Sequence, residues 1–191
     1  MAITRLGGAN AITGTLPAAN INNTSIGNVT ALPAGVGGKV LQVVSTTKTD
    51  TTSVSSSASF ADITGMSVSI TPSSTSSKIF IICSANIATN AGYNLHLRLV
   101  RDSTAICIGD ASGSRSSATM GIRPPDVYSR IERTMNFLDS PSSTSAIAYK
   151  LQWRQVDSTT AYLNRTYNDD DNDARPRLAS TITAMEIEGW L

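Results

Sequence analysis

Apolar and polar residues alternate along several stretches of the chain, and this two-residue period is typical of β-strands that bury one face. The clearest segments are Met66–Ile70, Tyr93–Arg101 and Ala146–Val156. Within the second segment, Leu95, Leu97 and Leu99 share one side and we expect them to face a core. The core-facing residues expected in the third segment are Ile147, Tyr149, Leu151 and Trp153.

Shorter apolar runs predict further strands. Val40–Val44 is rich in β-branched residues, and Lys78–Ala85 is apolar at both parities, as in a central strand of a sandwich. A two-residue turn before Ala105–Ile108 predicts a hairpin. We also expect a long strand over Val127–Leu138 and a final strand over Ser180–Trp190. The residues expected on one face of the long strand are Val127, Ile131, Met135 and Phe137.

Seven to nine such strands, separated by Ser, Gly and Pro turns and with no helical stripe, predict an all-β fold. The expected architecture over residues 39–191 is an antiparallel β-sandwich of jelly-roll type. Composition supports it, because charged residues make up 15% of the chain, against roughly 25% in an average soluble domain. Hydroxyl and β-branched residues replace them and suit pleated, half-buried surfaces.

Residues 1–38 have a different texture. No charged residue lies between Arg5 and Lys39, and the apolar residues are too sparse for a helix or a strand. The segment is either a flexible tail or an extended arm that docks on neighbouring chains. Its low charge favours the arm, because disordered segments are usually more charged. The apolar residues expected to make the assembly contacts are Ile12, Leu16, Ile21, Ile26 and Leu32.

The formal net charge of +1 gives no electrostatic reason to expect nucleic acid or an anionic membrane as a partner. No apolar run reaches the length needed to span a bilayer, so we expect no membrane insertion. Cys83 and Cys107 lie in apolar runs, which favours buried small side chains over a disulfide or a ligand pair. Arg outnumbers Lys, which favours contacts with other chains.

Candidate catalytic chemistry is sparse. The single histidine, His96, lies on the polar side of its strand, and no Ser–His–acid or Cys–His arrangement has spacing support. Glycoside cleavage needs two positioned carboxylates, and glutamate occurs at Glu132, Glu186 and Glu188 alone. We therefore expect no catalytic residue, no cofactor and no enzymatic activity.

One acidic cluster, Asn168–Asp173, is a candidate metal loop. Its aspartates follow the spacing that opens a calcium loop. However, the sixth position is Ala174 instead of glycine, and the twelfth is Ser180 instead of glutamate. Three arginines flank the cluster, so we expect an arginine-paired, solvated loop without a metal; a calcium site is the alternative.

Exposed aromatic residues beside polar groups are used by carbohydrate-binding surfaces. Tyr162 and Tyr167 are expected in the loop region that also holds the acidic cluster, where they are available to a glycan or a protein partner. The loop residues that we take as candidate receptor or partner contacts are Arg115, Tyr162, Tyr167, Asp169 and Asp171.

Several ordered blocks resemble a module of bacteriophage virions. Leu99–Arg115, LVRDSTAICIGDASGSR, is similar to the "RDST-I-IGDA-GSR" block of that module. Asn136–Pro141 with Ser145–Lys150 resembles its "FLDSP…TSA-TYK" block, and Ser180–Ile187 resembles its last strand. Ile12–Ile21 resembles the segments that lead into it. The module occurs in tail fibres and other structural proteins of marine and freshwater phages, including cyanophages.

The resemblance implies a structural, non-enzymatic virion protein that is commonly homotrimeric. Long fibres carry this module at the end of a large chain, whereas few residues precede it here. We therefore expect a short tail-fibre or fibre-tip protein that contributes to host attachment, with tail or baseplate proteins and a host surface glycan as partners. The alternative is a capsid decoration or cement protein whose N-terminal arm stabilises the head.

Overall fold

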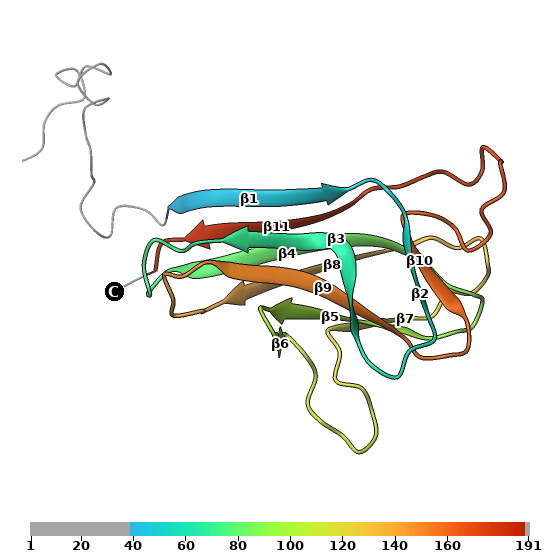
Figure 1. Ribbon diagram of the computed structural model, residues 1–191, viewed down its shortest axis with the longest axis horizontal. Coiled ribbons are helices and arrows are strands. Elements are labelled where there is room, and N and C mark those ends of the chain that lie inside the picture. Colours follow the sequence, from blue (N-terminus) through green and yellow to red (C-terminus); the bar gives the residue numbers. More distant parts are fainter. Residues whose placement is uncertain (1–38, 190–191) are drawn as a thin grey trace, which may run out of the picture. The chain divides into compact units, whose positions relative to one another are not determined.

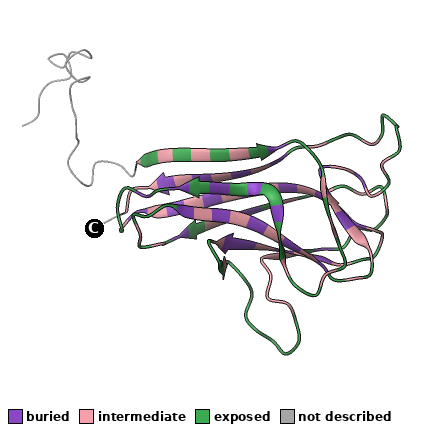
Figure 2. Ribbon diagram, viewed as in Figure 1, coloured by how far each residue is buried: buried purple, intermediate pink, exposed green. Residues whose placement is uncertain are grey.

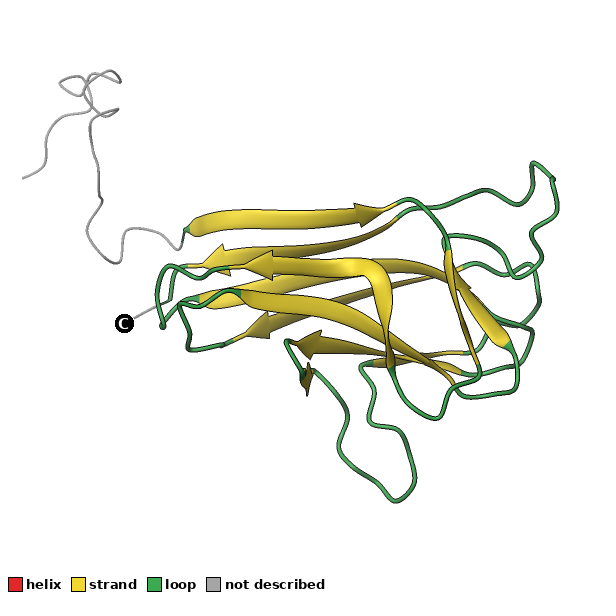
Figure 3. Cartoon of the chain, viewed as in Figure 1, coloured by secondary structure: helices red, strands yellow, loops and turns green. Residues whose placement is uncertain are grey.

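Residues 39–189 are described by the computed structural model, and the regular structure within them is β-strand throughout (Figure 3). Eleven strands form two antiparallel sheets that pack face to face (Figure 1). No helix among these residues has the length and apolar character needed to cross a membrane. The five expected assembly contacts between Ile12 and Leu32 lie outside the described residues.

The first sheet contains six strands. They are β1 (Val40–Lys48), β11 (Ser180–Ile187), β4 (Lys78–Ala88), β10 (Thr160–Leu163) and β2 (Thr52–Ser55) in that order, with β8 (Ile131–Asp139) also paired to β4. The second sheet contains β3 (Ala61–Ile70), β9 (Ile147–Gln155), β5 (Leu95–Arg101) and β6 (Thr104–Ile106), with β7 (Met120–Ile122) also paired to β5.

The strand order is that of a jelly roll. In the first sheet β1 pairs with β11, β11 with β4, and β4 with β8. In the second sheet β3 pairs with β9, β9 with β5, and β5 with β7. Neighbouring strands are thus mostly distant in the sequence, as two interlocked Greek keys require. The expected all-β sandwich of jelly-roll type is confirmed.

The core lies between the two sheets and follows the sequence periodicity (Figure 2). Leu95, Leu97 and Leu99 of β5 are buried, as the alternation predicted. On β9, Ile147, Tyr149, Leu151 and Trp153 are likewise buried. The residues that β4 contributes from the opposite sheet, each 0% exposed, are Ile79, Ile81, Cys83, Ala85 and Ile87. Because side chains alternate along a strand, one parity of each central strand supplies the core.

Some element boundaries differ from the expectation. β1 continues beyond Val44 to Lys48, because its Ser and Thr residues pair with β11 along their whole length. The expected long strand begins at Ile131 and not at Val127, which lies in the preceding turn. Tyr162 is not in a loop: it lies on β10, held by backbone pairing to Ser53 and Ala88.

The two cysteines differ in environment. Cys83 is buried in the core as expected, and burial raises the pKa of its thiol to about 12. Cys107 is exposed, contrary to the expectation of a buried side chain. The reason is local, because the hairpin strand β6 ends at Ile106 and Cys107 takes a left-handed backbone conformation with φ 53°. Both are free cysteines.

A buried carboxylate joins the edge strand β1 to the turn before β4. Glu186 of β11 faces inward and is 0% exposed. It accepts hydrogen bonds from the backbone N of Ser73 at 2.7 Å, from the hydroxyls of Ser73 and Ser77 at 2.6 and 2.7 Å, and from Nε2 of Gln42 at 2.6 Å. Burial on its own would raise the pKa of Glu186, but these hydrogen bonds outweigh it and lower the pKa to about 2.

A second buried carboxylate connects the two sheets. Asp139, at the end of β8, is 6% exposed and accepts a hydrogen bond from the hydroxyl of Tyr149 on β9 at 2.6 Å. Nη1 of Arg101, at the end of β5, lies 3.0 and 2.9 Å from its two oxygens. Burial, followed by the hydrogen bond to Asp139, raises the pKa of Tyr149. The phenol therefore remains a donor throughout the physiological pH range.

The Glu186 network predicts an acid-sensitive sandwich. A carboxyl whose folded pKa is lowered from 4.5 to about 2 stabilises the fold above pH 4.5, and this contribution is lost as the pH falls through 2. The shift corresponds to about 3 kcal/mol. Glu186→Gln should lower the free energy of unfolding at pH 7 by a comparable amount, since its amide cannot accept from all these donors.

Urea unfolding of both proteins at several pH values between 7 and 2 measures this effect. The difference in the free energy of unfolding between wild type and Glu186→Gln should become smaller as the pH falls below 4.5. A difference that stays constant across this range contradicts the assignment of a lowered pKa to Glu186.

Candidate functional site

A buried amide closes the loop that contains most of the predicted contact residues. Asn164 directly follows β10, is 0% exposed and has a left-handed backbone with φ 62°, which asparagine tolerates well. Its Nδ2 donates to the carbonyl oxygens of Lys48 at 2.8 Å and Asp50 at 3.0 Å. Its Oδ1 accepts from the hydroxyl of Ser180, the first residue of β11, at 2.6 Å. The two ends of loop 164–179 are thus tied together.

Arg165, in this loop, stacks on the ring of Tyr162 on β10. The guanidinium carbon of Arg165 lies 4.1 Å from the ring centre of Tyr162, a cation–π arrangement. Tyr167 meets Tyr162 edge to face, with ring centroids 5.8 Å apart. Arg165 also donates to the backbone oxygens of Thr166 and Tyr167, each at 3.0 Å. The side chain of Arg165 therefore organises both the rings and the backbone of the loop.

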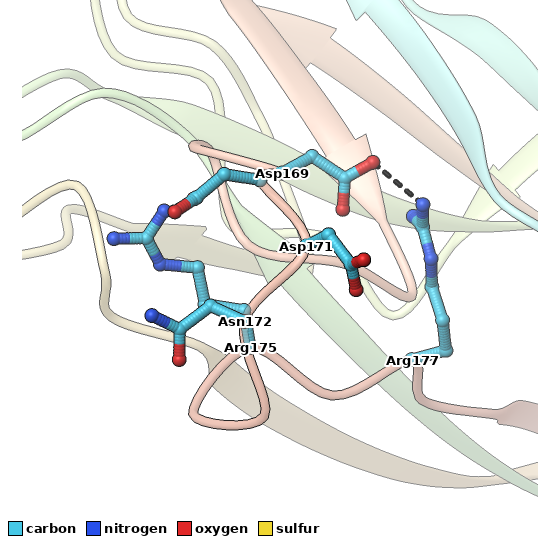
Figure 4. Close-up of a pocket in the computed structure, with 6 residues that line it drawn as sticks. Asp169, Asp171, Asn172, Arg175 and Arg177 are labelled. Atoms are coloured by element: carbon cyan, nitrogen blue, oxygen red, sulfur yellow. Dashed lines mark hydrogen bonds and ion pairs between the residues drawn. The ribbon is translucent and has the colours of Figure 1, made fainter.

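Arginines also neutralise part of the acidic cluster. The carboxylate of Asp169 lies 2.6 Å from Nη2 of Arg177 and 3.3 Å from Nη1 of Arg165. Arg175 forms an ion pair with Asp170. Figure 4 shows Asp169, Arg175 and Arg177 around a polar hollow. The residues that line it are Asp169, Asp170, Asp171, Asn172, Arg175 and Arg177.

The loop before β8 packs against this cluster. The guanidinium carbon of Arg175 lies 4.7 Å from the ring centre of Tyr128, which is 52% exposed. Arg130 donates from Nη1 to the carbonyl oxygen of Ala174 at 3.0 Å. Two separate loops and the end of β10 thus form one polar and aromatic surface, which we call the loop cluster: residues 126–130 and 162–177.

The structure places four of the five predicted contact residues in the loop cluster. Tyr162 and Tyr167 are half-buried in mutual contact, Asp169 is paired, and Asp171 is exposed. Arg115 does not join them: it lies in the exposed β6–β7 loop, well separated from the β10–β11 loop (Figure 1).

The geometry offers little catalytic chemistry within residues 39–189. No group of three or more His, Cys, Asp or Glu side chains in this range is arranged to hold a metal ion. His96 is half-buried on β5, and its Nδ1 has no hydrogen-bond partner among these residues. Burial, together with the nearby positive charge of Arg154, lowers the pKa of His96, so the ring is neutral at pH 7.

Sequence reasoning missed Asn164 and Tyr128 as members of this surface; it expected Arg175 to pair with the acidic cluster but missed its contact with Tyr128. Asn164 lies between a strand and a turn-rich stretch, where asparagine commonly supplies a left-handed residue, and this signal pointed to a turn. Tyr128 and Arg175 are far apart in the sequence, and no local pattern links them. Their contact depends on the packing of two loops from different parts of the chain.

No family model matches the chain, and no curated protein matches it. Two similar solved structures come from infectious bursal disease virus. One, of the Gx strain, is 12% identical over 78% of this chain with a TM-score of 0.39. The other, a VP2 subviral particle, is 13% identical over 78% of this chain with a TM-score of 0.38. This chain covers 40% and 41% of the length of those two chains.

The clamp at Asn164 predicts a large loss of stability on truncation. Asn164→Ala removes the donor to the carbonyl oxygens of Lys48 and Asp50 and the acceptor of the Ser180 hydroxyl, and the contacts with Lys48 and Ser180 are buried. The free energy of unfolding should fall by about 2–4 kcal/mol, measured by urea denaturation. Asn172→Ala in the same exposed loop removes one local hydrogen bond and should cost less than about 1 kcal/mol. Equal losses in the two variants would contradict a structural clamp.

The arginine-paired acidic cluster predicts that metal is dispensable. Asp169 and Asp170 already have cationic partners, so a calcium ion would have to displace them. Treatment with EDTA should leave the melting temperature of the full chain unchanged, measured by differential scanning calorimetry. A fall of several degrees that calcium restores would show that the cluster is a metal site.

Proposed function

We propose that this chain is a structural, non-enzymatic protein of a bacteriophage virion. The observation that carries the proposal is the jelly-roll topology, an architecture widely used by viral capsid and lectin domains. The blocks that resemble the phage module lie on elements of this fold, including β5–β6, β8–β9 and β11. The two buried carboxylates support a non-enzymatic role, because Asp139 and Glu186 accept hydrogen bonds from internal donors and are not available to a substrate.

Within the virion, we assign the chain to a short tail fibre or fibre tip that contributes to host attachment. The loop cluster supports this role, since it presents tyrosine rings, carboxylates and guanidinium groups side by side on one exposed surface. Such mixtures of aromatic faces and hydrogen-bonding groups suit the rings and hydroxyls of a host glycan. A homotrimer with other tail or baseplate proteins as partners is the expected assembly.

A capsid decoration or cement protein is the second candidate. The uncharged character of residues 6–38 favours it, because an extended apolar and hydroxyl-rich segment suits the stitching of neighbouring capsid subunits. Quantitative mass spectrometry of purified virions separates the two roles, since fibres are present in far fewer copies than capsid subunits.

The proposal predicts separate roles for residues 1–38 and the sandwich. The sandwich buries an apolar cluster of its own residues between Ile63 and Ala184, so deletion of residues 1–38 should leave a folded sandwich with an unchanged β-sheet circular dichroism spectrum. The same deletion should abolish incorporation into virions, measured by quantitative mass spectrometry after complementation of a phage that lacks the wild-type chain. Incorporation of the deleted chain at the wild-type copy number would show that residues 1–38 are a passive tail.

A further inference from the structure

The outer face of the first sheet, directed away from the core, has an apolar row. Backbone pairing aligns the four residues across four strands: Val43 of β1, Met185 of β11, Phe80 of β4 and Leu138 of β8. Val43 is 54% exposed and Leu138 is 53% exposed, while Phe80 and Met185 between them are half-buried. The row therefore runs from one edge strand to the other without a polar interruption.

Neighbouring positions extend the row into a patch. Val40 pairs with Ile187 on one side of it, and Val40 is 54% exposed. On the other side, Ile82 is half-buried. We call these seven residues the apolar patch: Val40, Val43, Phe80, Ile82, Leu138, Met185 and Ile187. Contiguous apolar surface of this kind on a soluble domain usually marks an interaction site.

The opposite half of the same face is different. Backbone pairing places Thr47, Thr181, Ser84 and Thr134 in one row across the same four strands. The hydroxyl of Ser84 donates to Glu132 at 2.8 Å, so this half is polar. The apolar character is therefore confined to the end of the sheet where β1 begins and β11 ends.

This location points to what covers the patch. The described chain begins at Lys39, immediately before Val40 of the patch, and residues 1–38 lead into it. No charge occurs between Arg5 and Lys39, while apolar residues recur along the segment. An uncharged segment with spaced apolar side chains suits an apolar surface, and among the outward residues paired in the rows of the patch Lys78 alone is charged.

The length of the segment favours a neighbouring copy over the same chain. Four strands of a sheet span about 15 Å, which an extended chain crosses with about five residues. Thirty-eight residues reach up to about 125 Å when extended, far beyond the patch beside which they end. A segment of this length can thus bring the apolar residues between Ile12 and Leu32 to a second molecule.

We propose that the apolar patch is the docking site for residues 1–38 of a neighbouring copy of this chain. Exchange of these segments then links the copies of the proposed homo-oligomer. The inference rests on the proposed assembly role and adds the surface that receives the segment. It also explains why the outward residues of β4 include Phe80 and Ile82.

The test uses full-length protein with two charge substitutions in the patch, Val43→Asp and Leu138→Asp, on opposite edge strands. The matched controls are Thr47→Asp and Thr134→Asp, which lie on the same two strands, face outward and are also exposed. A double variant, Leu16→Asp with Ile21→Asp, changes the docking segment without touching the sandwich. The mass of each protein is measured by light scattering at micromolar concentration, with circular dichroism as the check of folding.

The wild type and both controls should have the mass of an oligomer, close to three chains. Both patch variants, the double variant and a chain without residues 1–38 should have the mass of a monomer with an unchanged β-sheet spectrum. The proposal is overturned if a folded patch variant or the double variant keeps the wild-type mass, or if the wild type is itself a monomer. An oligomer that survives deletion of residues 1–38 but not Leu138→Asp would instead show that two patches pair directly. The double variant decides the outcome should both patch variants fail to fold.

Incorporation into virions separates this inference from the proposed function. If wild type enters virions while the patch variants keep the wild-type mass, the docking site is wrong and the structural role stands. If wild type does not enter virions, the proposed function fails whatever the masses are.

Discussion

The loop that follows β10 depends on one constraint in β4: the same edge of this strand changes partner from β11 to β10. At the change, the backbone of Asn86 would have no regular partner, and an unpaired buried group is costly. The hydroxyl of Ser180 accepts from Asn86 N at 3.0 Å, and Asn164 N donates to Asn86 O at 2.8 Å. The loop 164–179 must therefore leave and re-enter the sheet at one point. This fixes the base on which the loop cluster stands.

Because both ends of loop 164–179 are fixed, its side chains can form a defined set of contacts within the loop cluster. Arg165 then stacks on Tyr162 and pairs with Asp169, and Arg175 reaches Tyr128 from the other loop. Each of these contacts is weak when exposed, worth at most about 1 kcal/mol. They orient side chains on an already ordered backbone and add little to the stability of the fold. The result is a preorganised surface, and preorganisation lowers the entropic cost of binding in general.

The sequence predicted the long central strands well because their signal is local. The alternation of Leu95, Leu97 and Leu99 is visible in nine residues, and the core that it implies is confirmed. The short strands β2, β7 and β10 were not predicted, because strands of three or four residues exist only through their partners. In the same way, the arginine pairing of the acidic cluster followed from its neighbours in the sequence, whereas the contact between Tyr128 and Arg175 needed the tertiary fold.

In Lys78–Ala85 the side chains on both faces of the strand are mainly apolar. This pattern indicated a central strand, and β4 is central in its sheet. In a two-layer sandwich, however, such a strand faces the core on one side alone, and the other parity meets solvent unless something covers it. On β5, which is also central, two of the three outward positions are His96 and Arg98 and the third is Val100, so a fully apolar outer face is not required by the fold. The packing of the sandwich therefore does not account for Phe80 and Ile82, whereas the proposed docking of residues 1–38 of a neighbouring copy does.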